Sequence, residues 1–425
     1  MPAPTRPPFA PLANPVRAYA WGSTTAIPAL TGRPTTGEPQ AELWMGAHPS
    51  APSLRDDAGG AGPRPLDRLI AEDPEGELGP DTVRRFGPRL PFLFKVLAAE
   101  RALSLQVHPS RARAEAGFAA EEARGIPRDA PQRTFKDRDH KPELICALGD
   151  FEALCGFRPA SATAGLLDAL GVPLLAPWAT ALRRRPAGEV LPAMLRHVLE
   201  DVRPGPAELA GVAAALRRVA AEGGPYAAAC AAYARAARDY PGDPGLVAAL
   251  LLNHVRLRAG QALALDAGVP HAYLHGLGVE LMANSDNVLR CGLTAKHIDV
   301  AGLLVVTSFR TGEPPVLTAS PAGSPPASSP DGPRAVDAAG AGIEEVFPSP
   351  AEEFRLSRLR PAAAPARIDL AAPQILLCTT GRARLRSAAG HTLDLAPGGS
   401  AYLRPAGEPV LLTGTGAELF RATTG

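Results

Sequence analysis

The order of secondary-structure patterns restricts the fold of this chain more than any other feature. Residues from about 160 to 250 are rich in Ala and Leu with Arg at helical spacing, as in AELAGVAAALRRVAAEGGPYAAACAAYARAARDYP. Alanine has the highest helix propensity, so this block predicts a bundle of short helices. The segments on either side, LPFLFKVLAA before it and HVRLRAGQALALDAG after it, have the apolar runs and alternation of strands. We therefore expect a helical insertion in a β-domain.

The end of the chain predicts a second β-domain. Its strand-like runs are FRLSRL, QILLCTT, RARLRS, HTLDLAPGGSAYLRP and PVLLTG, which indicate a small sandwich or barrel. The preceding segment is rich in Pro, Ala, Ser and Gly, as linkers and mobile loops are. The expected fold class is mainly β. The expected domains are a first β-domain (1–157 with 253–311), a helical insertion (158–252), a linker or mobile loop (312–345) and a C-terminal β-domain (346–425).

Composition excludes several classes of protein. A length of 425 residues suggests two or three domains. The net charge is +1, from 44 basic and 43 acidic side chains, which argues against a nucleic-acid-binding protein. Neither a signal peptide nor an apolar run of membrane-spanning length is visible. The five cysteines are widely spaced without a CxxC pair, which favours a reduced, cytoplasmic protein. We expect a monomer, and any metal must use histidine, carboxylate or amide ligands.

Two potential metal ligands lie on the strand predicted by ALSLQVHPS. Gln106 and His108 are two residues apart, so their side chains point to the same face, and Pro109 ends the strand beside them. Taken alone, such a pair is more often a packed polar contact than a metal site.

The segment FKDRDHKPELI gathers seven charged or ionisable residues at 136–143. Its composition favours a solvated loop, but an apolar strand begins directly after Pro142. In an extended chain Lys141 and Glu143 share one face and His140 takes the other. A carboxylate beside an ammonium can combine a metal ligand with a base.

A third segment, GVPHAYLHGLGVELMANSDNVLRCGLTAKHID, begins at a glycine turn that places His271 at the start of a strand. It brings Asp, Asn, Arg and Lys unusually close to apolar residues. We interpret His275 and His297 as peripheral or structural.

Together these motifs resemble the type I mannose-6-phosphate isomerases, a zinc enzyme family built on cupin β-barrels. The matching pieces, in order, are NPVRAYAWGS, ELWMGAHPSAPS, LPFLFKVL, LSLQVHPS, FKDRDHKPEL, FEALCGFRP and PHAYLHG with ELMANSDNVLRCGLTAKHIDV. They lie between residue 14 and about 305, and the likeness is slight after residue 310. The resemblance implies two cupin-like (jelly-roll) domains and the interconversion of mannose 6-phosphate and fructose 6-phosphate. This reaction supplies mannose 6-phosphate for GDP-mannose and glycan synthesis, or lets mannose enter glycolysis.

The resemblance also implies a ligand set for one Zn²⁺ per chain. The matching residues are Gln106, His108, Glu143 and His271. Two nitrogen and two oxygen donors suit zinc without thiolates. The family's catalytic arginine matches Arg290, which would stabilise an enediolate or hold the phosphate.

Other roles follow from the chemistry of aldose–ketose isomerisation, which needs a base and a phosphate clamp. The candidate bases are Lys141, His140 and Asp286, and we prefer Lys141 because burial beside zinc favours a neutral amine. The candidate phosphate ligands are Lys296, Ser104 and Lys95. Trp21, Glu42 and His48 lie in matching segments and receive no role.

Three points remain open in the sequence. The family commonly has Thr-Pro-Lys where this chain has Thr294, Ala295 and Lys296, which puts the rigidity of that turn in question. Arg290 could also form a structural ion pair with Asp286, four residues earlier, as in one helical turn. Finally, two histidines and a carboxylate could hold iron in a cupin oxygenase, and a sugar-phosphate sensor could keep the fold without the chemistry.

Overall fold

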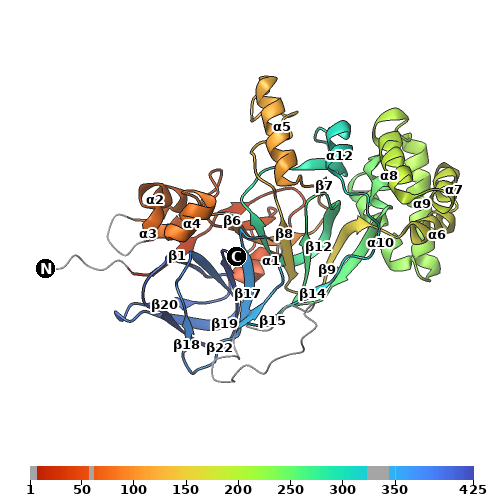
Figure 1. Ribbon diagram of the computed structural model, residues 1–425. Helices are drawn as coiled ribbons and strands as arrows, with labels where there is room; N and C mark the ends of the chain where they lie inside the picture. Colours follow the sequence, from red (N-terminus) through yellow and green to blue (C-terminus); the bar gives the residue numbers. More distant parts are fainter. Residues whose placement is uncertain (1–6, 57–61, 323–343, 350) are drawn as a thin grey trace, which may run out of the picture.

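The computed structural model describes residues 7–56, 62–322, 344–349 and 351–425 (Figure 1). Its two large sheets are antiparallel throughout, so the predicted mainly-β fold is confirmed. In Figure 1 the first sheet occupies the centre, the second sheet lies in blue at the lower left, and the helical block lies in green at the right.

The first sheet is built around the long strand β12. Its main path runs β14-β11-β8-β12-β6-β3-β2, and four further strands join through β7 and β9. The strands are β2 (Val16–Arg17), β3 (Glu42–Met45), β6 (Phe92–Ala99), β7 (Leu105–Val107), β8 (Glu143–Ala147), β9 (Phe151–Phe157), β10 (Leu252–Leu257), β11 (Gln261–Leu265), β12 (His271–Ala283), β13 (Leu289–Gly292) and β14 (Leu317–Thr318).

Strand β12 bends in its middle and so serves both halves of this sheet. Its second half pairs with β6 and β8, whereas its first half pairs with β7 and β9. At the bend Gly276 has φ 120°, and a Cβ there would lie 2.6 Å from the carbonyl oxygen of Asp150, so only glycine fits. Side chains from both halves, including Leu97, Phe151 and Tyr273, pack in one apolar cluster. The sheet therefore curves around its own core, as in a cupin-like barrel.

The chain leaves the first sheet after β9, forms the helices of the predicted insertion, and returns to the sheet at β10. These two strands pair with each other, so the two ends of the helical block lie side by side. The helices are α6 (Ala160–Leu170), α7 (Ala176–Arg184), α8 (Ala187–Arg196), α9 (Pro206–Glu222), α10 (Ala227–Asp239) and α11 (Gly245–Ala249). Their buried Leu, Val and Ala side chains form one core that also reaches β7 and β13.

The second sheet follows the path β15-β16-β17-β22-β19-β21-β1-β4-β5, with β18 and β20 attached to β22 and β19. Its strands are β1 (Phe9–Ala13), β4 (Leu54–Arg55), β5 (Arg64–Pro65), β15 (Ser320–Pro321), β16 (Glu344–Val346), β17 (Arg355–Leu359), β18 (Ala366–Ile368), β19 (Gln374–Arg386), β20 (Thr392–Leu395), β21 (Ser400–Leu403) and β22 (Val410–Thr423).

Two sequence-based boundaries do not follow the sheets. Residues 1–157 were expected in the first domain, yet β1 pairs with β21 and extends the second sheet. A short strand carries no signal for its partner, which tertiary packing selects. The expected linker 312–345 begins and ends with strands, because β14 pairs with β11 and β15 with β16. The part of that linker at 323–343 lies outside the described residues.

The remaining α-helices of the described residues lie outside the insertion. They are α1 (Ala26–Thr31), α2 (Leu66–Glu72), α3 (Pro74–Leu78), α4 (Pro80–Phe86), α5 (Arg111–Ala123) and α12 (Val300–Val306). Helix α5 begins shortly after the end of β7, and the Ser110 side chain accepts a hydrogen bond from the Arg113 amide as its N-cap. Among the described helices, none combines the length and the hydrophobicity that crossing a bilayer requires.

Candidate active site

Three strands bring His108, Glu143 and His271 together at one end of the first sheet. His108 follows β7, whereas Glu143 and His271 begin β8 and β12. The Nε2 atom of His108 lies 3.3 Å from Oε1 of Glu143, and Nε2 of His271 lies 3.4 Å from Oε2. All three side chains are almost fully buried, and one ligand atom from each lies within 4.8 Å of the other two. Two nitrogens and one carboxylate thus converge on one point.

The hydrogen bonds of the two histidines fix which ring nitrogen is available. Nδ1 of His108 lies 2.8 Å from the Asn287 carbonyl oxygen, and Nδ1 of His271 lies 2.9 Å from that of Val269. Each Nδ1 therefore holds the proton, which leaves a lone pair on Nε2. Both Nε2 atoms and Oε2 of Glu143 have no hydrogen-bond partner among the described residues. Buried polar atoms are seldom left unpaired, so these three donors fit a metal cation.

The electrostatics of this cluster match a cation site. Burial lowers the pKa of His108 to about 4, so its imidazole is neutral near pH 7. Burial alone would raise the pKa of Glu143, but the positive charge of Lys141 holds that pKa well below its usual range. The Lys141 Nζ atom lies 3.0 Å from Oε1 of Glu143. The predicted shared face of these two residues is therefore confirmed.

Gln106 lines a cleft and pairs across the strands with His271 of the buried cluster. On β7 it lies directly opposite His271 of β12 on one side and Arg290 of β13 on the other. Residues that face each other across antiparallel strands project to the same side of the sheet. The Gln106 side chain is partly exposed and lines the cleft.

The cleft has a volume of about 500 Å³ and lies between the first sheet and the edge of the helical block. Sequence-predicted residues that line it are Ser104, Gln106, Lys141, Asp286, Arg290, Lys296 and Lys95, together with Trp21, Glu42 and His48. Tyr240 from the helical block also lines it. Residues from segments far apart in the chain therefore share one cavity.

Three cationic side chains gather at one side of this cleft: Arg290, Lys136 and Lys296. Burial lowers the pKa of Arg290, and burial followed by repulsion from Arg290 and Lys136 lowers that of Lys296. Within the described parts of the chain, no carboxylate forms an ion pair with any of the three. Clustered cations without anionic partners suit a phosphate dianion. Lys136 is a residue that sequence reasoning left without a role, since only the fold places it beside the other two.

The alternative ion pair between Arg290 and Asp286, both among the described residues, is absent from the structure. The chain between them is a loop and then strand β13, so no helical turn brings them together. Instead, Oδ1 of Asp286 lies 3.5 Å from Nε2 of His48. The hydrogen bond from His48 lowers the pKa of Asp286, against the opposing effect of burial. His48 thus has a structural role that its sequence context did not indicate.

Lys95, a candidate phosphate ligand, lines the cleft but is also ion-paired with buried carboxylates. Its Nζ atom lies 3.0 Å from Oε2 of Glu280 and 3.7 Å from Oε1 of Glu42. Burial by itself would lower the pKa of Lys95, but the two carboxylates raise it above its usual value. Tyr273 donates a hydrogen bond to Glu280, and Trp44 donates one to Glu42. The lysine therefore forms ion pairs with two buried carboxylates, and its surface also touches the cleft.

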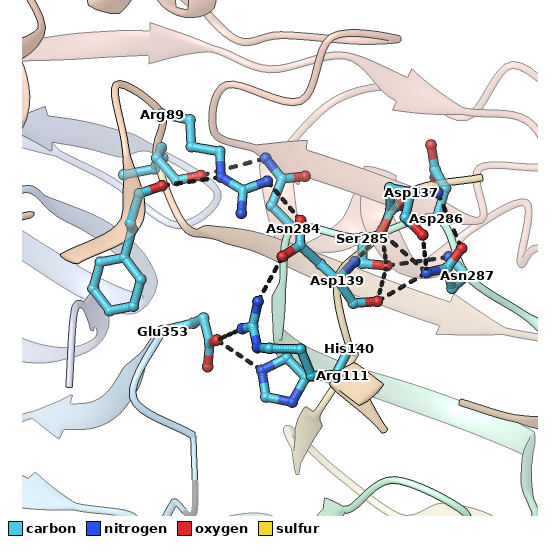
Figure 2. Close-up of polar contacts among 12 residues, drawn as sticks. Arg89, Arg111, Asp137, Asp139, His140, Asn284, Ser285, Asp286, Asn287 and Glu353 are labelled. Atoms are coloured by element: carbon cyan, nitrogen blue, oxygen red, sulfur yellow. Dashed lines mark hydrogen bonds and ion pairs between the residues drawn. The ribbon is translucent and has the colours of Figure 1, made fainter. Parts of the chain in front are cut away.

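His140, a candidate base, is not among the residues that line the cleft, and it faces Glu353 instead (Figure 2). Its Nε2 atom lies 2.7 Å from Oε1 of Glu353, which precedes β17 in the second sheet. Arg111 donates to the same carboxylate oxygen and also to Asp139. Extended backbone puts successive side chains on opposite faces, so Lys141 faces the cleft and His140 cannot. This geometry disfavours His140 as the base.

Asn287 joins its own loop to the loop that contains Asp137 and Asp139, as Figure 2 shows. Its Oδ1 accepts from the amides of Lys136 and Asp137, and its Nδ2 donates to the Asp137 and Asp139 carbonyl oxygens. Its own carbonyl oxygen accepts a hydrogen bond from Nδ1 of His108. Sequence reasoning missed this residue, because an asparagine in a loop carries no distinctive signal.

The chain matches known proteins along nearly its whole length. Residues 9–160 match the family described as phosphomannose isomerase type I, catalytic domain. The chain is 37% identical to the mannose-6-phosphate isomerase of Escherichia coli K12 over 419 residues, which cover 95% of this chain and 97% of that protein. It is 38% identical to the mannose-6-phosphate isomerase of Salmonella typhimurium LT2 over 408 residues, with the same coverage. The chain belongs to the type I phosphomannose isomerase family.

Solved structures of phosphomannose isomerases have the same fold. One is the Salmonella typhimurium mannose 6-phosphate isomerase bound to its substrate and to a zinc atom, with a TM-score of 0.84 and 36% identity. A zinc-bound mannose 6-phosphate isomerase matches with a TM-score of 0.84 and 37% identity. Both comparisons cover 98% of this chain and 100% of the other. The motifs resembled the family only slightly after residue 310. The structural match nevertheless covers 98% of this chain and so includes its second sheet.

Proposed function

We propose that this member of the family interconverts mannose 6-phosphate and fructose 6-phosphate at a zinc site. One observation carries the proposal beyond family membership. The buried His108–Glu143–His271 cluster presents unpaired donor atoms next to a cleft with three cations that no carboxylate of the described residues neutralises. A metal site and an anion site in one cavity suit a sugar phosphate whose two ends need different partners.

The zinc ligands that we propose are His108, Glu143 and His271, with Gln106 as the fourth. The free Nε2 lone pairs and the ionised carboxylate support this set. Zinc would supply Lewis-acid polarisation of sugar oxygens. Apart from that, the chemistry depends on side chains of the cleft.

Lys141 is the base that we propose for proton transfer. It lines the cleft and its ammonium pairs with Glu143. After that ammonium has given up its proton, the amine would take the proton from C2 of the open-chain aldose. The electron pair left behind forms the enediolate. A proton then passes from O2 to O1, and delivery of the C2 proton to C1 gives the ketose. Asp286 lines the same cleft and is the second candidate, but its lowered pKa makes it a weaker base.

Arg290 is placed to stabilise the negative charge that develops on the substrate oxygen. It lies opposite Gln106, so its guanidinium projects from the same face as the proposed metal ligands. Lys136 and Lys296 would hold the phosphate, with Ser104 beside them in the cleft. In this proposal Arg290 stabilises the enediolate, and the two lysines bind the phosphate.

The deciding experiment is an assay of purified protein with mannose 6-phosphate, in which the fructose 6-phosphate formed is measured. Turnover that a chelator abolishes and added Zn²⁺ restores would support the proposal. Bound iron with oxygen consumption would instead indicate an oxygenase, since two histidines and one carboxylate also suit iron. Sugar-phosphate binding without turnover would indicate a sensor. We further propose that the protein acts in the cytoplasm, where its product would feed GDP-mannose synthesis or glycolysis.

A further inference from the structure

The bend at 293–296, which connects β13 to the segment before α12, carries Lys296 at the edge of the cleft. Leu293, at its start, is fully buried and has φ 52°, in the left-handed region that residues other than glycine rarely adopt. Such a conformation costs free energy and persists only where neighbouring contacts hold it. The bend therefore needs an external support.

That support comes from the helical block. Oδ2 of Asp243 accepts a hydrogen bond of 2.8 Å from the amide of Thr294, and its Oδ1 accepts one of 2.7 Å from the amide of Gly245. Gly245 also packs against Gly292, where a Cβ on either glycine would lie 2.4 Å or less from the other's Cα. Asp243 thus ties two backbones together at a point of very close approach.

The same segment also contacts the opposite side of the cleft. The Tyr240 hydroxyl donates a 2.7 Å hydrogen bond to the carbonyl oxygen of Ala102, two residues before Ser104. Tyr240 and Lys296 both line the cleft and a second hollow of about 670 Å³ beside it. Residues 240–245 therefore bridge the segment that precedes β7 and the bend that carries Lys296.

We propose that Asp243 is a positioning residue for substrate binding, and that it acts by holding the 293–296 bend so that Lys296 faces the phosphate. The inference rests on the proposed function and gives the helical insertion a part in it. The residue at 295 is important here. Ala295 does not fix its backbone φ angle as a proline would, so the backbone tether to Asp243 supplies the stiffness.

The charge of Asp243 makes the test decisive. Its removal changes phosphate affinity in opposite directions if Asp243 acts through space and if it acts as a tether. A carboxylate in the hollow that Lys296 also lines weakens phosphate binding through space, so its removal alone would tighten binding. A tether has the opposite effect, since its removal frees the bend and weakens binding. Asp243→Asn removes the charge and one of the two hydrogen-bond acceptors while keeping the side-chain shape.

The experiment measures KM and kcat for fructose 6-phosphate together with the dissociation constant of inorganic phosphate by calorimetry. We expect Asp243→Asn to raise both KM and the phosphate dissociation constant by about tenfold, the scale of one lost hydrogen bond, with kcat within about twofold. Asp243→Glu should raise both as well, because it displaces the carboxylate yet retains the charge. Asp239→Asn, which removes a charge lining the same hollow without breaking the tether, should leave both unchanged or slightly lower.

A double-mutant cycle with Lys296→Met tests the route of the effect. If Asp243 acts through Lys296, Asp243→Asn should add nearly nothing in that background. Unchanged or tighter phosphate binding in Asp243→Asn would overturn the inference, and so would an equal loss with and without Lys296. Calorimetry with phosphate needs no turnover, so an inactive wild-type protein would count against the isomerase proposal while the tether was still being measured.

Discussion

The His140 Nε2 atom lies 2.7 Å from Oε1 of Glu353, which joins the segment before β8 to the second sheet (Figure 2). Arg111 donates to the same carboxylate oxygen. Lys141 and Glu143 follow His140 directly, so a residue of the C-terminal β-domain supports the segment that carries the proposed base and one metal ligand. This contact therefore links the segment that precedes β8 to the residues that precede β17.

Glu353→Gln should therefore lower the stability of the protein in a pH-dependent way. Burial opposes ionisation of Glu353, but the hydrogen bond and charge of His140 hold its pKa below the usual value. A lowered carboxyl pKa stabilises the fold above the ordinary glutamate range and loses this effect as pH falls through the lowered pKa. We expect a loss of about 1–3 kcal/mol at pH 7 that shrinks below about pH 4.

Urea unfolding at several pH values measures this difference. Glu352→Gln is the control. Glu352 is adjacent in sequence, but its side chain is 84% exposed, and its ion pair with Arg85 has an N–O distance of 3.9 Å. A constant difference between wild type and Glu353→Gln across the whole pH range would contradict the assigned contact.

His271→Ala should remove the bound metal and abolish turnover. The substitution deletes one of two buried imidazoles in a site with few other donors, and catalytic zinc typically relies on three protein ligands. His275→Ala is the matched control, since His275 lies on the same strand but is exposed. Metal analysis of the purified proteins should give one zinc per chain in wild type and in His275→Ala. Retention of a full equivalent in His271→Ala would show that the ligand assignment is wrong.

The C-terminal β-domain should bind no zinc of its own. Residues 346–425 contain a single histidine, His391, and no pair of ligands spaced for one face of a strand. Anomalous scattering from crystals at the zinc edge should therefore show one peak per chain, beside His108. A second protein-bound peak in the C-terminal residues would contradict this prediction.

Arg290→Lys should lower kcat with little change in KM. The substitution keeps the charge but loses the planar fork that lets a guanidinium share a developing negative charge. Loss of such a donor typically reduces kcat on the order of 10²–10³-fold. Steady-state kinetics with fructose 6-phosphate measures both constants. An increase in KM with kcat preserved would instead assign Arg290 to the phosphate, and normal kinetics with a lower melting temperature would make it structural.

Lys95→Met and Lys136→Met should separate a structural lysine from a binding lysine. Lys95 forms ion pairs with buried Glu280 and Glu42, so its loss leaves buried charge unpaired and should cost about 3–5 kcal/mol of stability. Lys136 has no ion-pair partner among the described residues, so its substitution should raise KM with little change in stability. Chemical denaturation beside steady-state kinetics compares the two variants. A stable Lys95→Met protein with a raised KM would restore the phosphate role for Lys95.

Local sequence patterns determined the elements and the ligand candidates of this protein. The alanine-rich composition of residues 160–250 predicted helices, because helix propensity acts within a few turns. The two-residue spacing of Lys141 and Glu143 predicted their shared face, because alternation is a property of one strand. The family resemblance then indicated which candidates form the site.

Tertiary structure alone decided what depends on contacts between distant segments. The partner of β1, the burial of Lys95 between two carboxylates and the grouping of Lys136 with Arg290 and Lys296 all join residues far apart in the chain. Sequence records which side chains are present, but their charge environment depends on which neighbours packing brings within a few ångströms, where Coulomb interactions and desolvation are strong. For this reason a lysine on a predicted strand could be assigned to phosphate from the sequence, and only the folded chain shows that it already forms ion pairs with two buried carboxylates.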